Sequence, residues 1–137
     1  VKVMNIFIKG MLPQAIVRKL NKEEKDTYAA PYPTIKSRKP LLVWPNEVPI
    51  SGSPNDVHDI ISAYSQKLQT SDISKLLFYA SPGAIIDEKY LEWCKDNLKN
   101  LKTVDIGKGI HFVQEDHPHL IGENLAQWVQ TLGNAPS

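Results

Sequence analysis

Residues 75–80, with the sequence Lys-Leu-Leu-Phe-Tyr-Ala, form the stretch that decides the fold. A short, nearly continuous apolar run of this kind is typical of a strand buried on both faces of a parallel sheet. Ser81-Pro82-Gly83 turns the chain, Asp87 is expected to open a helix, and residues 102–106 predict the next strand. The helix would turn these residues inward: Tyr90, Leu91, Cys94 and Leu98. Together the elements predict a βαβ unit with a right-handed crossover.

Two further helices are predicted around this unit. Ser53-Pro54-Asn55-Asp56 is a helix start, with a capping serine, a proline at the first helical position and an acid in the first turn. The apolar face of that helix would hold Val57, Ile60, Ile61, Tyr64 and Leu68. A last helix, from residues 116–118 to Gly133, would bury Ile121, Leu125, Trp128, Val129 and Leu132. Two parallel strands cannot make a stable sheet alone, since both faces and at least one edge need covering, so the remaining strands are expected from elsewhere.

The residues before 53 follow a different sequence pattern. One helix is expected from Pro13 to Leu20, and a second from Asn21, whose side chain can cap it while Glu24 completes a capping box. The following segment is predicted to be an extended, packed loop, because prolines interrupt regular structure there. These prolines are Pro31, Pro33, Pro40, Pro45 and Pro49.

Composition narrows the possible partners. The chain has 137 residues and a formal net charge of +1, without a basic stripe, so nucleic acid is not expected as a partner. Its single cysteine, Cys94, excludes an internal disulfide and every multi-cysteine metal site, and a buried, inert thiol is expected. No apolar run approaches the roughly 20 residues that span a bilayer, and residues 1–8 do not fit a signal peptide. We therefore expect a soluble, cytoplasmic protein that holds no metal and does not bind membranes.

His111 is the candidate catalytic residue. It lies in Gly109-Ile110-His111-Phe112-Val113-Gln114-Glu115-Asp116, just after an apolar strand and before an acidic helix start. Sites in open α/β sheets form at the carboxyl ends of strands, and an imidazole there suits a general base. The alternative is a histidine that only satisfies a buried hydrogen bond. His58, His117 and His119 are interpreted as surface or solvated helix-start residues.

The chain offers no nucleophile that such a base would assist. No Gly-x-Ser/Asp/Cys-x-Gly elbow and no phosphate-cradling glycine loop occur in it. Asp87 and Glu88 follow the first strand, but a helix cap explains both of them. The residues thus predict half of an active site, on the C-terminal portion of an enzyme.

Four blocks of the sequence carry a resemblance to a known family. They are Phe7-Ile8-Lys9-Gly10-Met11-Leu12-Pro13, Trp44-Pro45-Asn46-Glu47-Val48-Pro49-Ile50, residues 75–78 with Ser81-Pro82-Gly83, and residues 111–116 with Leu120-Ile121-Gly122. In order and in spacing they resemble the haloalkane dehalogenases. The resemblance implies an α/β-hydrolase fold, present in part: residues 1–52 would be the later part of a helical cap, and residues 53–137 the end of the core.

The resemblance also implies a reaction and a pocket. In this family a carboxylate displaces the halide of a small halogenated alkane, and a histidine-activated water hydrolyses the resulting ester; no cofactor takes part. His111 matches the histidine of that motif. The substrate pocket would be lined by Phe7, Met11, Ala15, Trp44, Pro45, Val48, Ala84, Ile85 and Ile110.

The departures from the family pattern are equally informative. The family's nucleophilic aspartate and its halide-binding tryptophan and asparagine precede the matched blocks. Gly83 stands where many relatives of this fold carry the triad acid, which implies the subgroup whose acid, a glutamate, also comes earlier. An N-terminal complement is therefore the expected partner. The alternatives are an inactive orphan fragment or interaction module, an epoxide hydrolase, and a coelenterazine luciferase relative. An epoxide hydrolase would need cap tyrosines that donate to the epoxide oxygen, and Tyr28 and Tyr32 do not match that motif.

Overall fold

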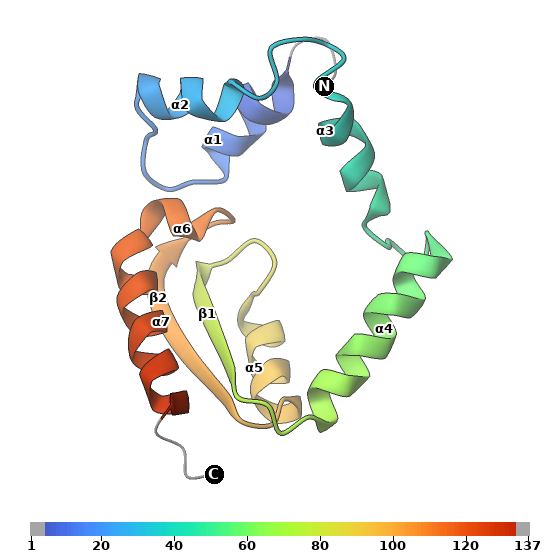
Figure 1. Ribbon diagram of the computed structural model, residues 1–137, viewed down its shortest axis with the longest axis vertical. Coiled ribbons are helices and arrows are strands. Elements are labelled where there is room, and N and C mark those ends of the chain that lie inside the picture. The colour runs from blue at the N-terminus through green and yellow to red at the C-terminus, as the bar shows by residue number, and fades with distance from the viewer. Residues whose placement is uncertain (1–4, 134–137) are drawn as a thin grey trace. The chain divides into compact units, whose positions relative to one another are not determined.

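The computed structural model describes residues 5–133 of the chain (Figure 1). Residues 1–4, which belong to the stretch that did not fit a signal peptide, lie outside the described residues. Within 5–133 no helix is both long and apolar enough to cross a membrane.

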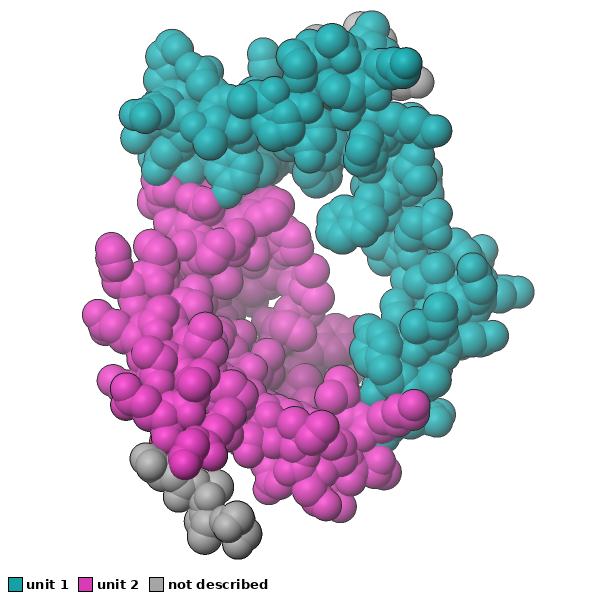
Figure 2. Space-filling view, in the orientation of Figure 1, with its two compact units in different colours: residues 1–15, 19–66 teal, residues 16–18, 67–137 magenta. Residues whose placement is uncertain are grey.

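The chain divides into two compact units, which Figure 2 distinguishes by colour. Unit 1 comprises residues 1–15 and 19–66, and unit 2 comprises residues 16–18 and 67–137. The sequence-based division at residue 52 separates a cap segment from a core segment. The two units do not test that division, and it stays a prediction.

Unit 2 is built on a parallel pair of strands. β1 (Lys75–Pro82) and β2 (Leu101–Gly109) pair from Lys75 opposite Leu101 to Pro82 opposite Gly109, and α5 (Glu88–Asn97) connects them. The predicted parallel strand–helix–strand unit is confirmed. Both strands extend beyond their predicted ends at Ala80 and Ile106, and the register shifts once, between Tyr79 and Ser81.

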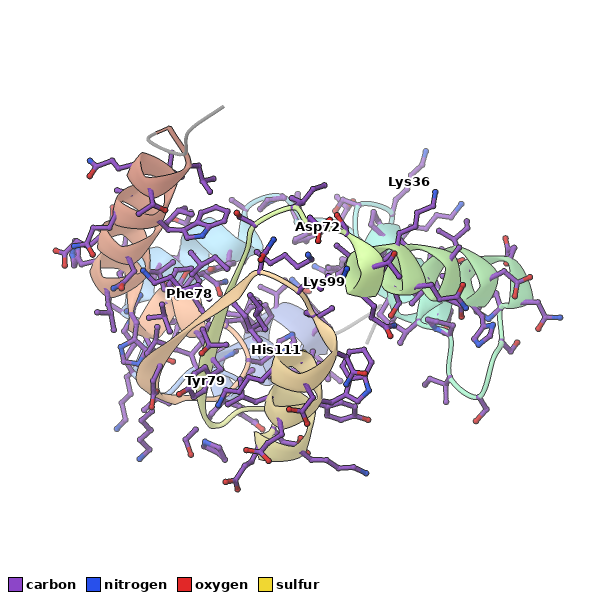
Figure 3. All side chains as sticks on the ribbon, turned by 90° about the horizontal axis from the view of Figure 1, so that it is seen from below. Lys36, Asp72, Phe78, Tyr79, Lys99 and His111 are labelled. Atoms are coloured by element: carbon purple, nitrogen blue, oxygen red, sulfur yellow. The ribbon has the colours of Figure 1, made fainter. Side chains whose placement is uncertain are left out.

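Lys75 closes the beginning of this sheet. Its ammonium donates to the backbone carbonyls of Ser71, Ile73 and Lys99, at 2.8, 2.8 and 3.0 Å. The Lys99 ammonium in turn lies 3.6 Å from the Asp72 carboxylate (Figure 3). The loops that precede the two strands are thereby tied to each other, which explains why a lysine begins an otherwise apolar run.

The helix between the strands follows its predicted start but not the whole of its predicted inward face. Asp87 caps α5, because its Oδ1 accepts the backbone N–H of Tyr90 at 2.9 Å. Leu91 is buried, Cys94 and Leu98 are half-buried, and Tyr90 is 56% exposed. Leu91, Cys94 and Leu98 recur at intervals of three and four and share one helix face. Tyr90 stands at the edge of that face, four residues before Cys94, and its predicted burial is wrong.

α7 (Pro118–Gly133) follows the short α6 (Val113–Asp116) and contacts both strands. Its predicted beginning is confirmed, and the described part of the helix reaches Gly133, where the sequence predicts its stop. Three of its apolar residues are exposed although burial was predicted: Leu125 by 43%, Val129 by 53% and Leu132 by 41%. A sheet of two strands offers a helix only part of the surface that it needs, which is why these side chains stay uncovered.

Unit 1 begins with η1 (Phe7–Met11), a π-helical segment that continues into α1 (Leu12–Gln14). Ile8 and Leu12 are buried on it. The helix predicted from Pro13 to Leu20 is wrong, because helical structure ends at Gln14. The second predicted helix is confirmed as α2 (Lys22–Ala29).

The N-terminus of α2 has the predicted capping box. The Asn21 side chain accepts the backbone N–H of Glu24 at 2.9 Å, and the Glu24 carboxylate accepts the backbone N–H of Asn21 at 2.7 Å. Two backbone donors that helix geometry leaves without partners are thus satisfied.

The proline-rich segment is more regular than predicted. It contains α3 (Lys39–Val43) and the 3₁₀ helix η2 (Trp44–Glu47), so the expected extended loop is wrong for residues 39–47. Pro40 and Pro45 each stand in the first turn of a helix, where a missing N–H costs nothing.

α4 (Asn55–Thr70) begins one residue later than its predicted serine cap implies, because the Pro54 carbonyl accepts the backbone N–H of His58 at 3.0 Å. Its predicted apolar face is present, yet it is exposed at Ile60 (65%), Tyr64 (49%) and Leu68 (40%). Like α7, this helix carries an apolar face that the described residues leave uncovered.

Gly83, in the turn after β1, generates a stability prediction. Its φ is +66°, and a Cβ there would lie 2.4 Å from the Ile86 carbonyl oxygen and 2.9 Å from that of Ala80. Backbone atoms cannot shift without distorting the turn, so Gly83→Ala should lower the free energy of unfolding by about 1–3 kcal/mol. Urea denaturation would measure this difference.

Gly122→Ala is the matched control. Gly122 lies inside α7, and a Cβ there would meet no atom within 4 Å. Alanine favours helix over glycine, so this change should raise stability by about 0.4–1 kcal/mol. Equal stability of the two variants would mean that the turn after β1 adjusts freely.

Candidate functional site

The carboxyl ends of β1 and β2 meet at one edge of the sheet, and two backbone hydrogen bonds continue their pairing beyond the strands. Gly83 N–H donates to the Gly109 carbonyl at 3.2 Å, and Ala84 N–H donates to the Ile110 carbonyl at 2.8 Å. The turn after β1 is therefore attached to the segment that carries His111. This is the edge at which open α/β sheets place their sites.

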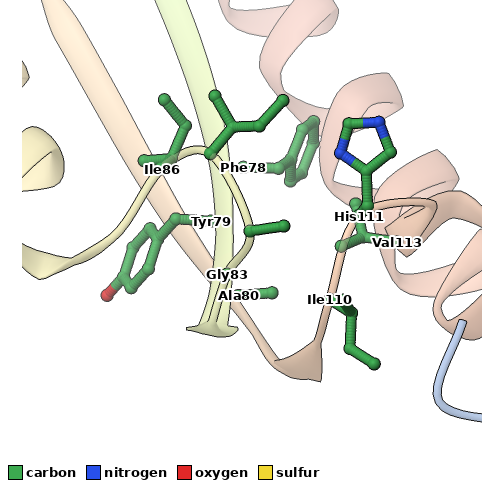
Figure 4. A pocket seen from close by; sticks show the side chains of 10 residues that line it. Phe78, Tyr79, Ala80, Gly83, Ile86, Ile110, His111 and Val113 are labelled. Atoms are coloured by element: carbon green, nitrogen blue, oxygen red, sulfur yellow. The ribbon is translucent and has the colours of Figure 1, made fainter. Parts of the chain in front are cut away.

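An apolar hollow of about 250 Å³ opens at this edge (Figure 4). Four residues expected at the site, Ala84, Ile85, Ile110 and His111, line it together. The other lining residues are Phe78, Tyr79, Ala80, Gly83, Ile86 and Val113. Apart from the imidazole and the Tyr79 hydroxyl, every side chain in this set is apolar, as a pocket for an uncharged apolar ligand requires.

His111 lies two residues beyond the end of β2, closer to the strand than its predicted end at Ile106 implied. The side chain is exposed, and its ring meets the Phe112 ring edge to face, with centroids 4.7 Å apart and planes at 77°. Within residues 5–133 neither ring nitrogen of His111 has a hydrogen-bond partner. The imidazole is thus open on both nitrogens, toward a substrate, a water or a carboxylate.

Six expected pocket residues lie in unit 1. Phe7 and Met11 are four residues apart in η1, which places them on one helical face, and Ala15 is the residue that ends α1. Trp44 and Pro45 belong to η2, and Val48 follows it directly. Met11 is 54% exposed, Trp44 75% and Val48 57%. Their joining with the hollow of unit 2 into one pocket stays a prediction.

The hollow contains a candidate base without a nucleophile. None of its lining residues is an aspartate, a glutamate, a serine or a cysteine. Gly83 leaves no room for an acid at its own position, because even a Cβ would meet two backbone carbonyl oxygens. Asp87 is engaged as the cap of α5, as the sequence predicted.

Three polar residues after His111 anchor its loop, and sequence reasoning did not assign them that role. The Asp116 carboxylate accepts the backbone N–H groups of Val17 and Arg18, at 3.1 and 2.9 Å. The Arg18 guanidinium pairs with Glu115 at 2.6 Å. His117, interpreted from the sequence as a solvated residue, has its Nε2 2.7 Å from the Lys108 carbonyl oxygen. The polar run directly after an apolar strand was the available signal.

Neither the cysteine thiol nor a metal-binding cluster adds a reactive group to the described residues. Burial raises the pKa of the half-buried Cys94 thiol, which lowers its thiolate fraction at neutral pH and makes it a poor nucleophile. Among residues 5–133 no cluster of three histidine, cysteine or acidic side chains is placed to hold a metal ion.

Comparison with known proteins gives a consistent result. No family model matches the chain. The chain is 39% identical to a haloalkane dehalogenase of Bradyrhizobium diazoefficiens and 40% identical to one of Mesorhizobium japonicum, in each case over 91% of this chain and 40% of the relative. The solved haloalkane dehalogenase DbeA from Bradyrhizobium elkani superposes with a TM-score of 0.95 at 38% identity, over 98% of this chain and 46% of that one.

A more distant structure agrees. The haloalkane dehalogenase DatA from Agrobacterium tumefaciens superposes with a TM-score of 0.84 at 33% identity, over 93% of this chain and 44% of that one. The chain spans less than half the length of each of these proteins. By sequence and by fold it is homologous to the haloalkane dehalogenases, and it corresponds to the C-terminal part of these α/β-hydrolases.

Proposed function

We propose that this chain supplies the general-base histidine and half of the substrate pocket of a haloalkane dehalogenase. The observation that carries the proposal is the position of His111, at the carboxyl ends of two parallel strands and beside an apolar hollow. Both nitrogens of its ring are open within the described residues, which suits a base that takes a proton from water and passes it on.

The proposed reaction has two steps. A carboxylate of the complementing part attacks the carbon that bears the halogen, the carbon–halogen bond breaks, and halide leaves with the bonding electrons. His111 then takes a proton from a water molecule, whose oxygen attacks the carbonyl carbon of the alkyl ester. The ester C–O bond breaks, the His111 imidazolium gives its proton to the departing oxygen so that the alcohol leaves, and the new carboxylic acid loses its proton, which regenerates the carboxylate. One water is consumed, and one proton is released with the halide.

The pocket wall is proposed to combine both units. Ala84, Ile85 and Ile110 would line it from the core side. The cap side would contribute Phe7, Met11, Ala15, Trp44, Pro45 and Val48. Such a wall would hold a small halogenated alkane by apolar contact and would keep bulk water from the ester. A cytoplasmic location, expected from the sequence, stays a prediction.

The complement is proposed to be an N-terminal part that carries the nucleophile, the triad acid and the missing strands of the sheet. Two features support it. The exposed apolar residues of α4 and α7 need a covering surface, as do the faces of a two-stranded sheet. The chain also corresponds to only 40–46% of the length of its dehalogenase relatives.

The first prediction concerns this chain by itself. It should release no halide from a short bromoalkane and should bind a hydrophobic dye, because its apolar faces are uncovered. Co-expression with the part of the Bradyrhizobium diazoefficiens relative that precedes the matched region should suppress dye binding and restore halide release. Steady halide release by the isolated chain would contradict the proposal, whereas failure of every complement would favour an orphan fragment.

The second prediction concerns His111 in the complemented protein. His111→Phe should leave alkylation intact and block ester hydrolysis, so that about one halide per site is released in a burst and steady turnover falls at least about 100-fold. Mass spectrometry should find the alkyl group on the complementing chain. His58→Phe, on the exposed surface of α4, is the control and should keep full turnover. Unchanged turnover in His111→Phe would remove His111 from the mechanism.

A further inference from the structure

The His117 side chain closes the loop that contains His111. Its Nε2 lies 2.7 Å from the Lys108 carbonyl oxygen, which belongs to β2. A backbone carbonyl can only accept a hydrogen bond, so Nε2 carries the proton and donates it. The bond joins residues 108 and 117, and His111 lies between them.

The backbone of His117 makes two further hydrogen bonds in the same region. Its N–H donates to the Val113 carbonyl at 2.9 Å and so ends α6, while its own carbonyl accepts the N–H of Ile121 at 3.1 Å in α7. The residue therefore connects α6 and α7 through its backbone and attaches both to β2 through its side chain.

The strand side of the loop is held independently. Gly109 and Ile110 are bound through their carbonyls to the turn after β1. Beyond Ile110 this support ends, and the His111 ring has no hydrogen-bond partner of its own within residues 5–133. The direction of the ring therefore depends on how firmly the far side of the loop is fixed, where His117 binds β2 and where Glu115 and Asp116 bind residues 17 and 18.

We propose that His117 is a positioning residue for His111, and this inference rests on the proposed function. By holding the loop closed, the Nε2–H bond keeps the His111 imidazole where it can take a proton from the hydrolytic water. The bond survives protonation of His117, because Nε2 carries a hydrogen in both charge states. Alkylation does not use His111, so the loss of His117 should act on ester hydrolysis alone.

The first test needs no substrate. Nitrogen-15 spectra of the neutral His117 imidazole in the chain should show the Nε2–H tautomer. His117→Ala should accelerate amide hydrogen exchange in residues 109–116 about tenfold, the size of one net hydrogen bond. His117→Gln retains a side-chain N–H donor and should reverse most of this effect. His119→Ala is the matched control, because His119 is exposed in the first turn of α7, and it should leave the exchange rates of residues 109–116 unchanged.

The second test uses the complemented enzyme. His117→Ala should lower kcat about tenfold through slower ester hydrolysis, while the halide burst keeps its rate, and His117→Gln should recover most of kcat. A purely structural role would slow both steps together, and that result would overturn the proposal. An Nδ1–H tautomer, or unchanged exchange in His117→Ala, would overturn it as well. Missing turnover in the unsubstituted complex would count against the proposed function, and the exchange and tautomer measurements would still decide the anchoring.

Discussion

Parallel pairing between β1 and β2 is the constraint on which the site depends. Because the strands run in one direction, both of their carboxyl ends reach the same edge of the sheet. Two backbone hydrogen bonds, from Gly83 to Gly109 and from Ala84 to Ile110, carry the pairing past the strands. An antiparallel pair would place one of the two loops at the opposite edge, and the apolar hollow beside His111 would not form.

The same edge shows a division between a crowded and an open side. The turn after β1 is so close that Gly83 cannot bear a side chain, and Gly109 is similarly confined, since a Cβ there would lie 2.7 Å from that of Ala80. His111 and Ile85, by contrast, are exposed. The two glycines thus stand where the chain is closely packed, whereas the side chains that would meet a substrate are exposed.

Uncovered apolar surface and an incomplete catalytic set have one common explanation. The lining residues of the hollow include no nucleophile, and α4 and α7 carry exposed leucine, isoleucine and valine. A domain buries its apolar faces by layering helices over a wider sheet. A two-stranded portion therefore leaves apolar surface uncovered and the catalytic set incomplete. The proposed complement would remedy both at once, because the missing strands would carry both the covering surface and the catalytic carboxylates.

The sequence by itself determined the local elements: the apolar run of β1, the caps at Asn21 and Asp87, and the place of His111 just after a strand. These follow from short-range chemistry, since capping and strand patterning depend on residues a few positions apart. Only the tertiary structure decided what depends on distant neighbours. Helical structure ends at Gln14 instead of Leu20, and Asp116, nearly 100 residues further on, binds the backbone N–H groups of Val17 and Arg18. His117, solvated by every local criterion, bonds to Lys108 because a turn of chain returns it to β2.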